Sequence, residues 1–108
     1  MHLLVVNLTG RTALSTTISV LRELGAHSLS VLDSESLSTD NLSTYPYAEK
    51  FPEGAGSRPT GGSTILCLLH NTETFDTLRK RLEELKVNFD ADNNFMALLP
   101  VSQAVGIH

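Results

Sequence analysis

The chain has 108 residues, which is enough for one domain with a single hydrophobic core. Its formal charge of −4 and pI near 5.4 argue against nucleic-acid binding, which usually requires a basic domain. The single cysteine excludes an internal disulfide, and no apolar run approaches the ~20 residues of a membrane-spanning helix. We therefore predict one cytoplasmic domain over residues 1–108 that is not embedded in a membrane and binds no nucleic acid.

The first half of the chain predicts a strand, a helix and a second strand. Residues 3–8 form a nearly continuous apolar run, which is typical of a strand buried on both faces. Apolar side chains then recur at helical spacing, at Leu14, Ile18, Leu21 and Leu24. Gly25 stands where a glycine commonly ends a helix. Alternating residues over 28–37 indicate a half-buried strand.

The second half repeats this order. Residues 64–69 form another apolar run that predicts a buried strand. Asn71 and Thr72 can cap a helix that follows them. The apolar stripe of that helix is expected at Phe75, Leu78, Leu82 and Leu85. A last strand is predicted over residues 95–99, and Pro100 either ends it or lies at its edge.

Two strand–helix–strand halves predict the fold class. Each half favours a right-handed crossover, and two such halves interleave into a four-stranded antiparallel sheet with both helices on one face. This α+β arrangement, βαββαβ, is ferredoxin-like. Strands as apolar as residues 3–8 and 64–69 leave the helix-free face of the sheet hydrophobic, and a large exposed apolar patch usually marks an interface. We therefore expect an oligomer in which the sheets pack against one another.

Residues 38–63 stand out as a long connection between the second and third strands. They hold three of the four prolines and four of the seven glycines, so they favour neither a helix nor a central strand. A structureless connection of about 20 residues or more is rare inside a compact domain and is usually functional or disordered. We predict a flexible, functional loop. Its Tyr45 and Tyr47 either hold a ligand or partner or pin the loop to the domain.

The end of this loop imitates a phosphate-binding P-loop without being one. Residues 56–63 have glycine where the motif requires lysine, and they precede a strand rather than a helix. A looser role stays open, in which amides of Gly61 and Gly62 approach an anion and Arg58 pairs with phosphate.

No catalytic or metal-binding motif stands out elsewhere. The four histidines lack ligand spacing, and Cys67 lies in a predicted buried strand, which favours an inert core thiol. We therefore predict a protein that is not an enzyme. An alternative hypothesis, a small enzyme or metal-handling protein, would require His2, His70 or Cys67 to converge in a cleft.

Parts of the sequence follow the pattern of a known superfamily. These parts are residues 21–25 (LRELG), 28–33 (SLSVLD), 62–67 (GSTILC) and 96–101 (MALLPV), together with the long insertion at 38–63. The pattern resembles the P-II-like superfamily of small trimeric signalling proteins, which includes nitrogen-regulatory P-II, PstA and CutA-like proteins. In P-II proteins the insertion corresponds to the T-loop.

The resemblance implies a regulatory homotrimer whose inter-subunit clefts bind a nucleotide or another small anion. Binding would order the loop over residues 38–63 for a transporter or enzyme partner. The residues predicted to bind the ligand lie at the start of the loop, at its end and near the C-terminus: Asp33, Ser34, Ser36, Arg58, Gly61, Gly62 and Gln103. The identity of the ligand, and of any cofactor, is left open. A second hypothesis is a ligand-independent structural or protein-interaction module of the same fold.

Overall fold

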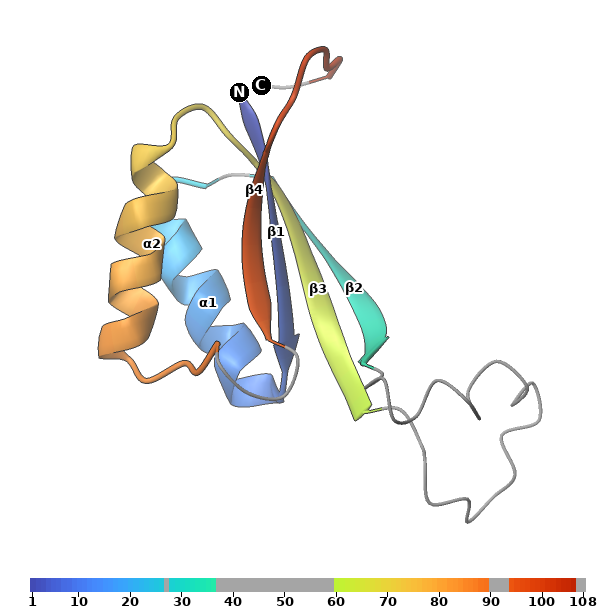
Figure 1. The fold of residues 1–108 in the computed structure, drawn as a ribbon, viewed down its shortest axis with the longest axis vertical. Helices are drawn as coiled ribbons and strands as arrows, with labels where there is room; N and C mark the ends of the chain where they lie inside the picture. The colour runs from blue at the N-terminus through green and yellow to red at the C-terminus, as the bar shows by residue number, and fades with distance from the viewer. Residues whose placement is uncertain (27, 37–59, 90–93, 107–108) are drawn as a thin grey trace, which may run out of the picture.

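The computed structural model describes residues 1–26, 28–36, 60–89 and 94–106. The elements are β1 (His2–Thr9), α1 (Arg11–Glu23), β2 (Leu29–Ser36), β3 (Thr60–Leu69), α2 (Glu73–Glu84) and β4 (Phe95–Pro100). The strands form one 4-stranded sheet in the order β2-β3-β1-β4, and each pair is antiparallel. Both helices lie on the same side of the sheet (Figure 1). The predicted α+β class with a four-stranded antiparallel sheet and two helices is confirmed.

Helix α1 packs one face on the sheet and ends where the sequence predicts. Its buried residues include Thr17, whose hydroxyl donates to the carbonyl of Ala13 at 2.8 Å, so this polar group has a partner inside the core. Gly25 follows the helix with a φ of 90°, a conformation that glycine adopts without strain. The amide of Ala26 donates to the carbonyl of Leu21, which completes a Schellman motif around Gly25.

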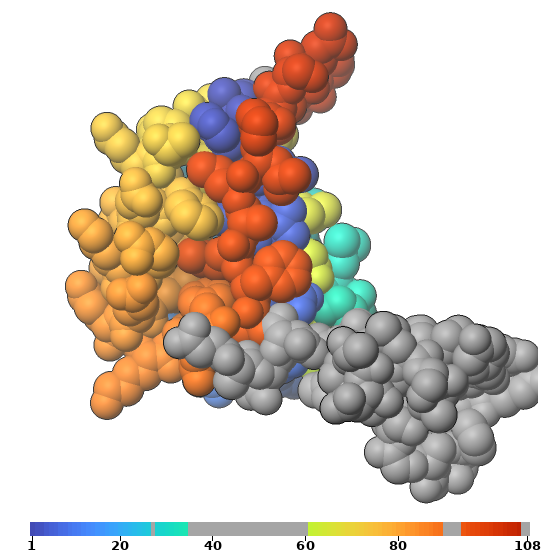
Figure 2. Space-filling model, in the orientation of Figure 1, coloured from blue at the N-terminus to red at the C-terminus, as the bar shows by residue number. Residues whose placement is uncertain are grey.

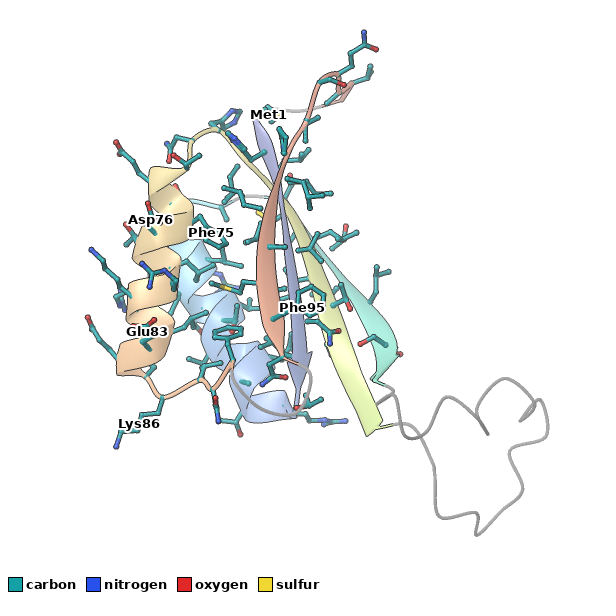
Figure 3. All side chains as sticks on the ribbon, in the orientation of Figure 1. Met1, Phe75, Asp76, Glu83, Lys86 and Phe95 are labelled. Carbon is teal, nitrogen blue, oxygen red and sulfur yellow. The ribbon has the colours of Figure 1, made fainter. Side chains whose placement is uncertain are left out.

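Helix α2 begins at a cap supplied by Asn71. The Oδ1 atom of Asn71 accepts the backbone amide of Thr74 at 3.0 Å, so this predicted cap is confirmed, whereas Thr72 makes no side-chain cap bond. Phe75 points toward the sheet, as expected (Figure 3). The prediction for Leu85 was wrong: this residue follows the last turn of the helix and is 49% exposed.

Lys86 ends α2 in a conformation that usually belongs to glycine. Its φ is 65°, and the amide of Val87 donates to the carbonyl of Leu82 at 2.9 Å, the same Schellman pattern as at Gly25. Because a side chain at positive φ is strained, Lys86→Gly is expected to raise the free energy of unfolding by about 0.5–1 kcal/mol. Urea denaturation followed by circular dichroism measures the change.

The control for this prediction is Lys80→Gly, the same substitution at an exposed position inside α2. It should lower the free energy of unfolding by about 1 kcal/mol, since glycine is unfavourable in a helix interior. Equal destabilisation by both substitutions would contradict the role assigned to Lys86.

The core lies between the two helices and one face of the sheet. On β1 every second residue is fully buried, namely Leu4, Val6 and Leu8, as alternation along a strand requires. The other buried apolar residues come from β3 and the helices: Val20, Leu21, Ile65, Cys67, Leu69, Leu78 and Leu82. The predicted burial of Cys67 is confirmed.

The opposite, helix-free face of the sheet carries no charged residue at its described positions. By alternation and strand register these positions are Leu3, Val5, Asn7, Thr9, Ser30, Leu32, Ser34, Gly62, Thr64, Leu66, Leu68, Phe95, Ala97 and Leu99. Phe95 and Leu99 are 48% and 45% exposed, and Phe95 lies on the side of β4 away from α2 (Figure 3). This surface, which we call the helix-free face, is largely apolar.

The start of β3 and the burial of β2 differ from the sequence prediction. Strand β3 begins at Thr60, so residues 60–63, predicted as the end of the loop, belong to the sheet. Within this stretch, Gly62 pairs on both sides, with Ser34 of β2 and with Thr9 of β1. Strand β2 is also less buried than predicted: Val31 is 45% exposed, since β2 is at the edge of the sheet farthest from the helices (Figure 1).

Candidate functional site

Strand pairing brings several predicted ligand-binding residues together at one end of the sheet. In the β2–β3 register, Asp33 lies opposite Ser63 and Ser34 lies opposite Gly62. Gly61 precedes Gly62 in β3 and lies opposite Glu35. This group of residues, which we call the loop base, lies where β2 ends and β3 begins (Figure 1). Ser36, the last residue of β2, is opposite Thr60 in the same register.

Arg58 and Gln103 are the other two residues predicted to bind the ligand. Arg58 lies outside the described residues, as do Tyr45 and Tyr47. Gln103 is exposed and follows β4, whose last residue, Pro100, pairs with His2 at the start of β1. Gln103 therefore lies near the opposite end of the sheet from the loop base in the same protomer (Figure 1).

Asn7 connects the strands beside the loop base, and the sequence reasoning missed it. Its Oδ1 atom accepts the hydroxyl of Thr64 at 2.9 Å and the hydroxyl of Ser34 at 3.2 Å. Ser34 is on β2 and Asn7 on β1, so this second bond crosses the intervening strand β3. It passes the position of Gly62, which has no side chain to obstruct it. The sequence did contain a signal for Asn7, because it is the polar residue within the apolar run of residues 3–8.

Thr9 and Asn94 form a second polar link near the loop base. The amide and hydroxyl of Thr9 donate to Oδ1 of Asn94 at 2.8 and 3.2 Å. The Nδ2 atom of Asn94 in turn donates to the carbonyl of Asn88 at 2.8 Å. Since Thr9 is paired with Gly62, these bonds hold the end of β1 in place beside the loop base.

The loop base is polar but is not positively charged within the described part of the chain. Asp33 is exposed and makes no ion pair with another described residue. The neutral groups beside it are hydroxyls and the backbone of Gly61 and Gly62. An anion bound here would be held by amides and hydroxyls, with Arg58 as the basic residue that the sequence places nearest.

Two hollows in the surface lie away from the loop base. One, of about 210 Å³, is lined by residues at the end of α1 and the start of α2, including Ala26, His70 and Thr74. The other, of about 410 Å³, is an open depression beside the start of β2, where Leu3 and Leu66 contribute to its lining. Neither includes a residue that the sequence predicts to bind ligand. We therefore place the candidate site by strand register and not by cavity shape.

The residues of the metal hypothesis do not form a cluster. The thiol of Cys67 is buried, and burial raises its pKa, which disfavours the reactive thiolate. His2 pairs with Leu69, and its Nδ1 atom is buried without a hydrogen-bond partner among the described residues. Within the described ranges, no three His, Cys, Asp or Glu side chains are arranged to hold a metal ion.

Comparison with known proteins gives no family for this chain. No family model matches the sequence, and no curated protein matches it significantly. Neither helix of the described structure is long and apolar enough to cross a membrane. The function proposed below therefore rests on the sequence pattern and on the geometry of the loop base.

The Asn7 link is expected to stabilise the fold. Asn7→Ala leaves the hydroxyls of Ser34 and Thr64 without their acceptor, so it should lower the free energy of unfolding by about 1–2 kcal/mol. A double-mutant cycle with Ser34→Ala, measured by urea denaturation, should show a coupling above about 0.5 kcal/mol. Ser30→Ala, on the same face of β2, is the control and should change stability by less than about 0.5 kcal/mol. Zero coupling would contradict the link.

Proposed function

We propose that this chain is a P-II-like regulatory protein of ferredoxin-like fold. It assembles as a homotrimer, and its inter-subunit clefts bind a nucleotide or another small anion. Binding orders the connection between β2 and β3 for a transporter or enzyme partner. A ligand can regulate a protein by making contacts that favour one arrangement of a segment over another. The protein is not an enzyme in this proposal.

The observation that carries the proposal is the composition of the loop base. Residues chosen from the sequence at the two ends of the long connection, Ser34 and Gly62, are direct neighbours across β2 and β3. Gly61 beside them leaves open space at its Cβ position, so a ligand can approach the backbone there. A ligand bound at this point contacts both ends of the connection at once, and can therefore change its arrangement.

The position of Gln103 supports a site shared between protomers. It lies near the opposite end of the sheet from Ser34 and Gly62 in one protomer, so a site that uses all three residues requires a neighbouring copy. This requirement agrees with an assembly in which ligand clefts lie between subunits. It also makes oligomerisation a precondition for binding.

The helix-free face supplies a surface for such an assembly. Four strands about 4.8 Å apart, with a mean length of eight residues at about 3.3 Å per residue, cover a flat area of about 500 Å². Protruding side chains increase the accessible surface toward the about 800 Å² that each partner buries in a standard interface. An uncharged face can be buried against another copy without the cost of desolvating charges.

Calorimetry on the purified protein tests the proposal. Titration with ATP, ADP, AMP and cyclic dinucleotides should show saturable binding by at least one of them, and light scattering should give a trimer. Arg58→Ala should weaken binding about tenfold or more, because a phosphate loses its charged partner. Arg79→Ala, which removes an exposed arginine on α2, should leave binding unchanged. A trimer that binds none of these compounds would refute the nucleotide proposal.

A ligand-independent interaction module is the second candidate, and the helix-free face favours it. This function needs a docking surface but no small-molecule site. It predicts that no added metabolite changes the thermal stability of the protein. It also predicts that deleting residues 38–59 abolishes partner capture while the sheet stays folded.

A further inference from the structure

Strand β2 has an open edge in the described structure. It pairs with β3 on one side only, and no described strand lies on its other side. The pairing runs without interruption from Leu29 to Ser36, so no bulge bends the strand away from a partner. An edge of this kind presents unpaired backbone N–H and C=O groups, which form a template for another strand.

Two common protections of edge strands are missing from β2, although it carries the exposed, charged Asp33. Proline and lysine commonly block an edge, and β2 contains neither. The other edge strand, β4, is shorter and ends in Pro100. Both helices lie on the other side of the molecule from β2, so neither helix covers the outer edge of this strand (Figures 1 and 2). Of the two edges, β2 is therefore the one suited to strand addition.

The exposed side chains of β2 indicate which kind of strand would bind. Val31 and Leu32 are 45% and 49% exposed and point to opposite faces of the strand. Asp33 is exposed and has no ion-pair partner among the described residues. Opposite charges across neighbouring strands are favourable, whereas like charges are not. A complementary strand thus combines apolar and basic side chains.

A second copy of β2 does not meet this requirement. It contains no lysine or arginine, so in any register it offers Asp33 no basic partner. The β4 strand of another copy has no charged residue either. The occupant that the charges favour is a segment of a different protein.

We propose that the open edge of β2 binds an extended basic segment of a partner protein by strand addition. Backbone hydrogen bonds to β2 provide affinity, and basic side chains opposite Asp33 provide specificity. This inference shares Asp33 with the loop base, but strand addition uses the backbone of the outer edge of β2 and needs no bound nucleotide, and the peptide titration is measured without nucleotide. Its failure and the failure of nucleotide binding are therefore separate results.

A peptide titration of the full-length protein tests the inference. The probe is a capped eight-residue peptide that alternates valine and lysine, and the comparison peptide alternates valine and glutamate. In NMR spectra the lysine peptide should shift the amides of β2 and slow hydrogen exchange of those that face outward. Asp33→Lys should weaken its binding about fivefold to tenfold and improve binding of the glutamate peptide.

The control variant is Glu84→Lys, which changes the net charge equally at an exposed position of α2. It should leave peptide preference unchanged, and circular dichroism should show both variants folded. Equal binding of the two peptides, no effect of Asp33→Lys, or shifts confined to Leu66 and Leu68 on the helix-free face would overturn the inference. Outward-facing β2 amides already protected without peptide would overturn it too, since another copy would then occupy the edge.

Discussion

Replacing Gly62 with alanine is expected to lower the free energy of unfolding by about 3 kcal/mol. A Cβ atom at this position would lie 2.5 Å from the carbonyl oxygen of Leu8, closer than real Cβ contacts occur. The clash is with backbone of the central strand β1, which cannot rotate away as a flexible side chain would. Relief requires β1 and β3 to move apart where they pair, and this movement would also disturb the hydrogen bond between Ser34 and Asn7.

Gly61→Ala is the matched control for this prediction. It is the same substitution one residue earlier, and the added Cβ would meet no atom within 4 Å. Urea denaturation should therefore show a change of less than about 0.5 kcal/mol for Gly61→Ala. If both variants lose the same stability, the effect belongs to glycine content in the strand and not to the contact with Leu8.

Leu4→Ala is expected to have an effect of similar size for a different reason. Leu4 is fully buried on β1, between Cys67 of β3 and Leu98 of β4, and faces the helices. Truncation removes buried apolar atoms and leaves a cavity, which together cost about 2–5 kcal/mol at such sites. We expect a loss of about 3 kcal/mol in the free energy of unfolding, measured by urea denaturation.

Leu32→Ala provides the comparison for the core substitution. Leu32 is 49% exposed on the helix-free face, so the free energy of unfolding of a monomer should fall by less than about 1 kcal/mol. The same variant also reports on assembly. If oligomers bury this face, the loss of stability should increase with protein concentration, because dissociation and unfolding are then coupled. A loss as large as that for Leu4→Ala in dilute monomer would contradict the assignment of the core.

The helices and strands could be predicted because their signals are local. The apolar stripe of α1 and the glycine at its end are read within a few residues, and the structure confirms both at Leu21 and Gly25. Leu85 shows the limit of this reading. It continues the helical spacing of Leu82 in the sequence, but α2 ends at Glu84, and the positive φ of Lys86 then turns the chain away from the helix axis.

The loop base could be predicted only in part. Composition pointed to both ends of the long connection, and Ser34 and Gly62 do meet there. The start of β3 could not be found in this way, because two glycines ordinarily indicate a loop. This position of the strand requires glycine because the carbonyl of Leu8 lies too close for a Cβ atom. That requirement comes from a residue distant in the sequence.

The sequence by itself determined the order of the elements, the glycine that ends α1, the Asn71 cap of α2 and the apolar character of the central strands. These follow from periodicity and from the conformational preferences of neighbouring residues. Only the tertiary structure decided that Asn7 bonds to Ser34 across β3 and that β2 pairs on one side only among the described strands. Both depend on which strands pair and in which register, and pairing is set by the packing of segments that are far apart in the chain.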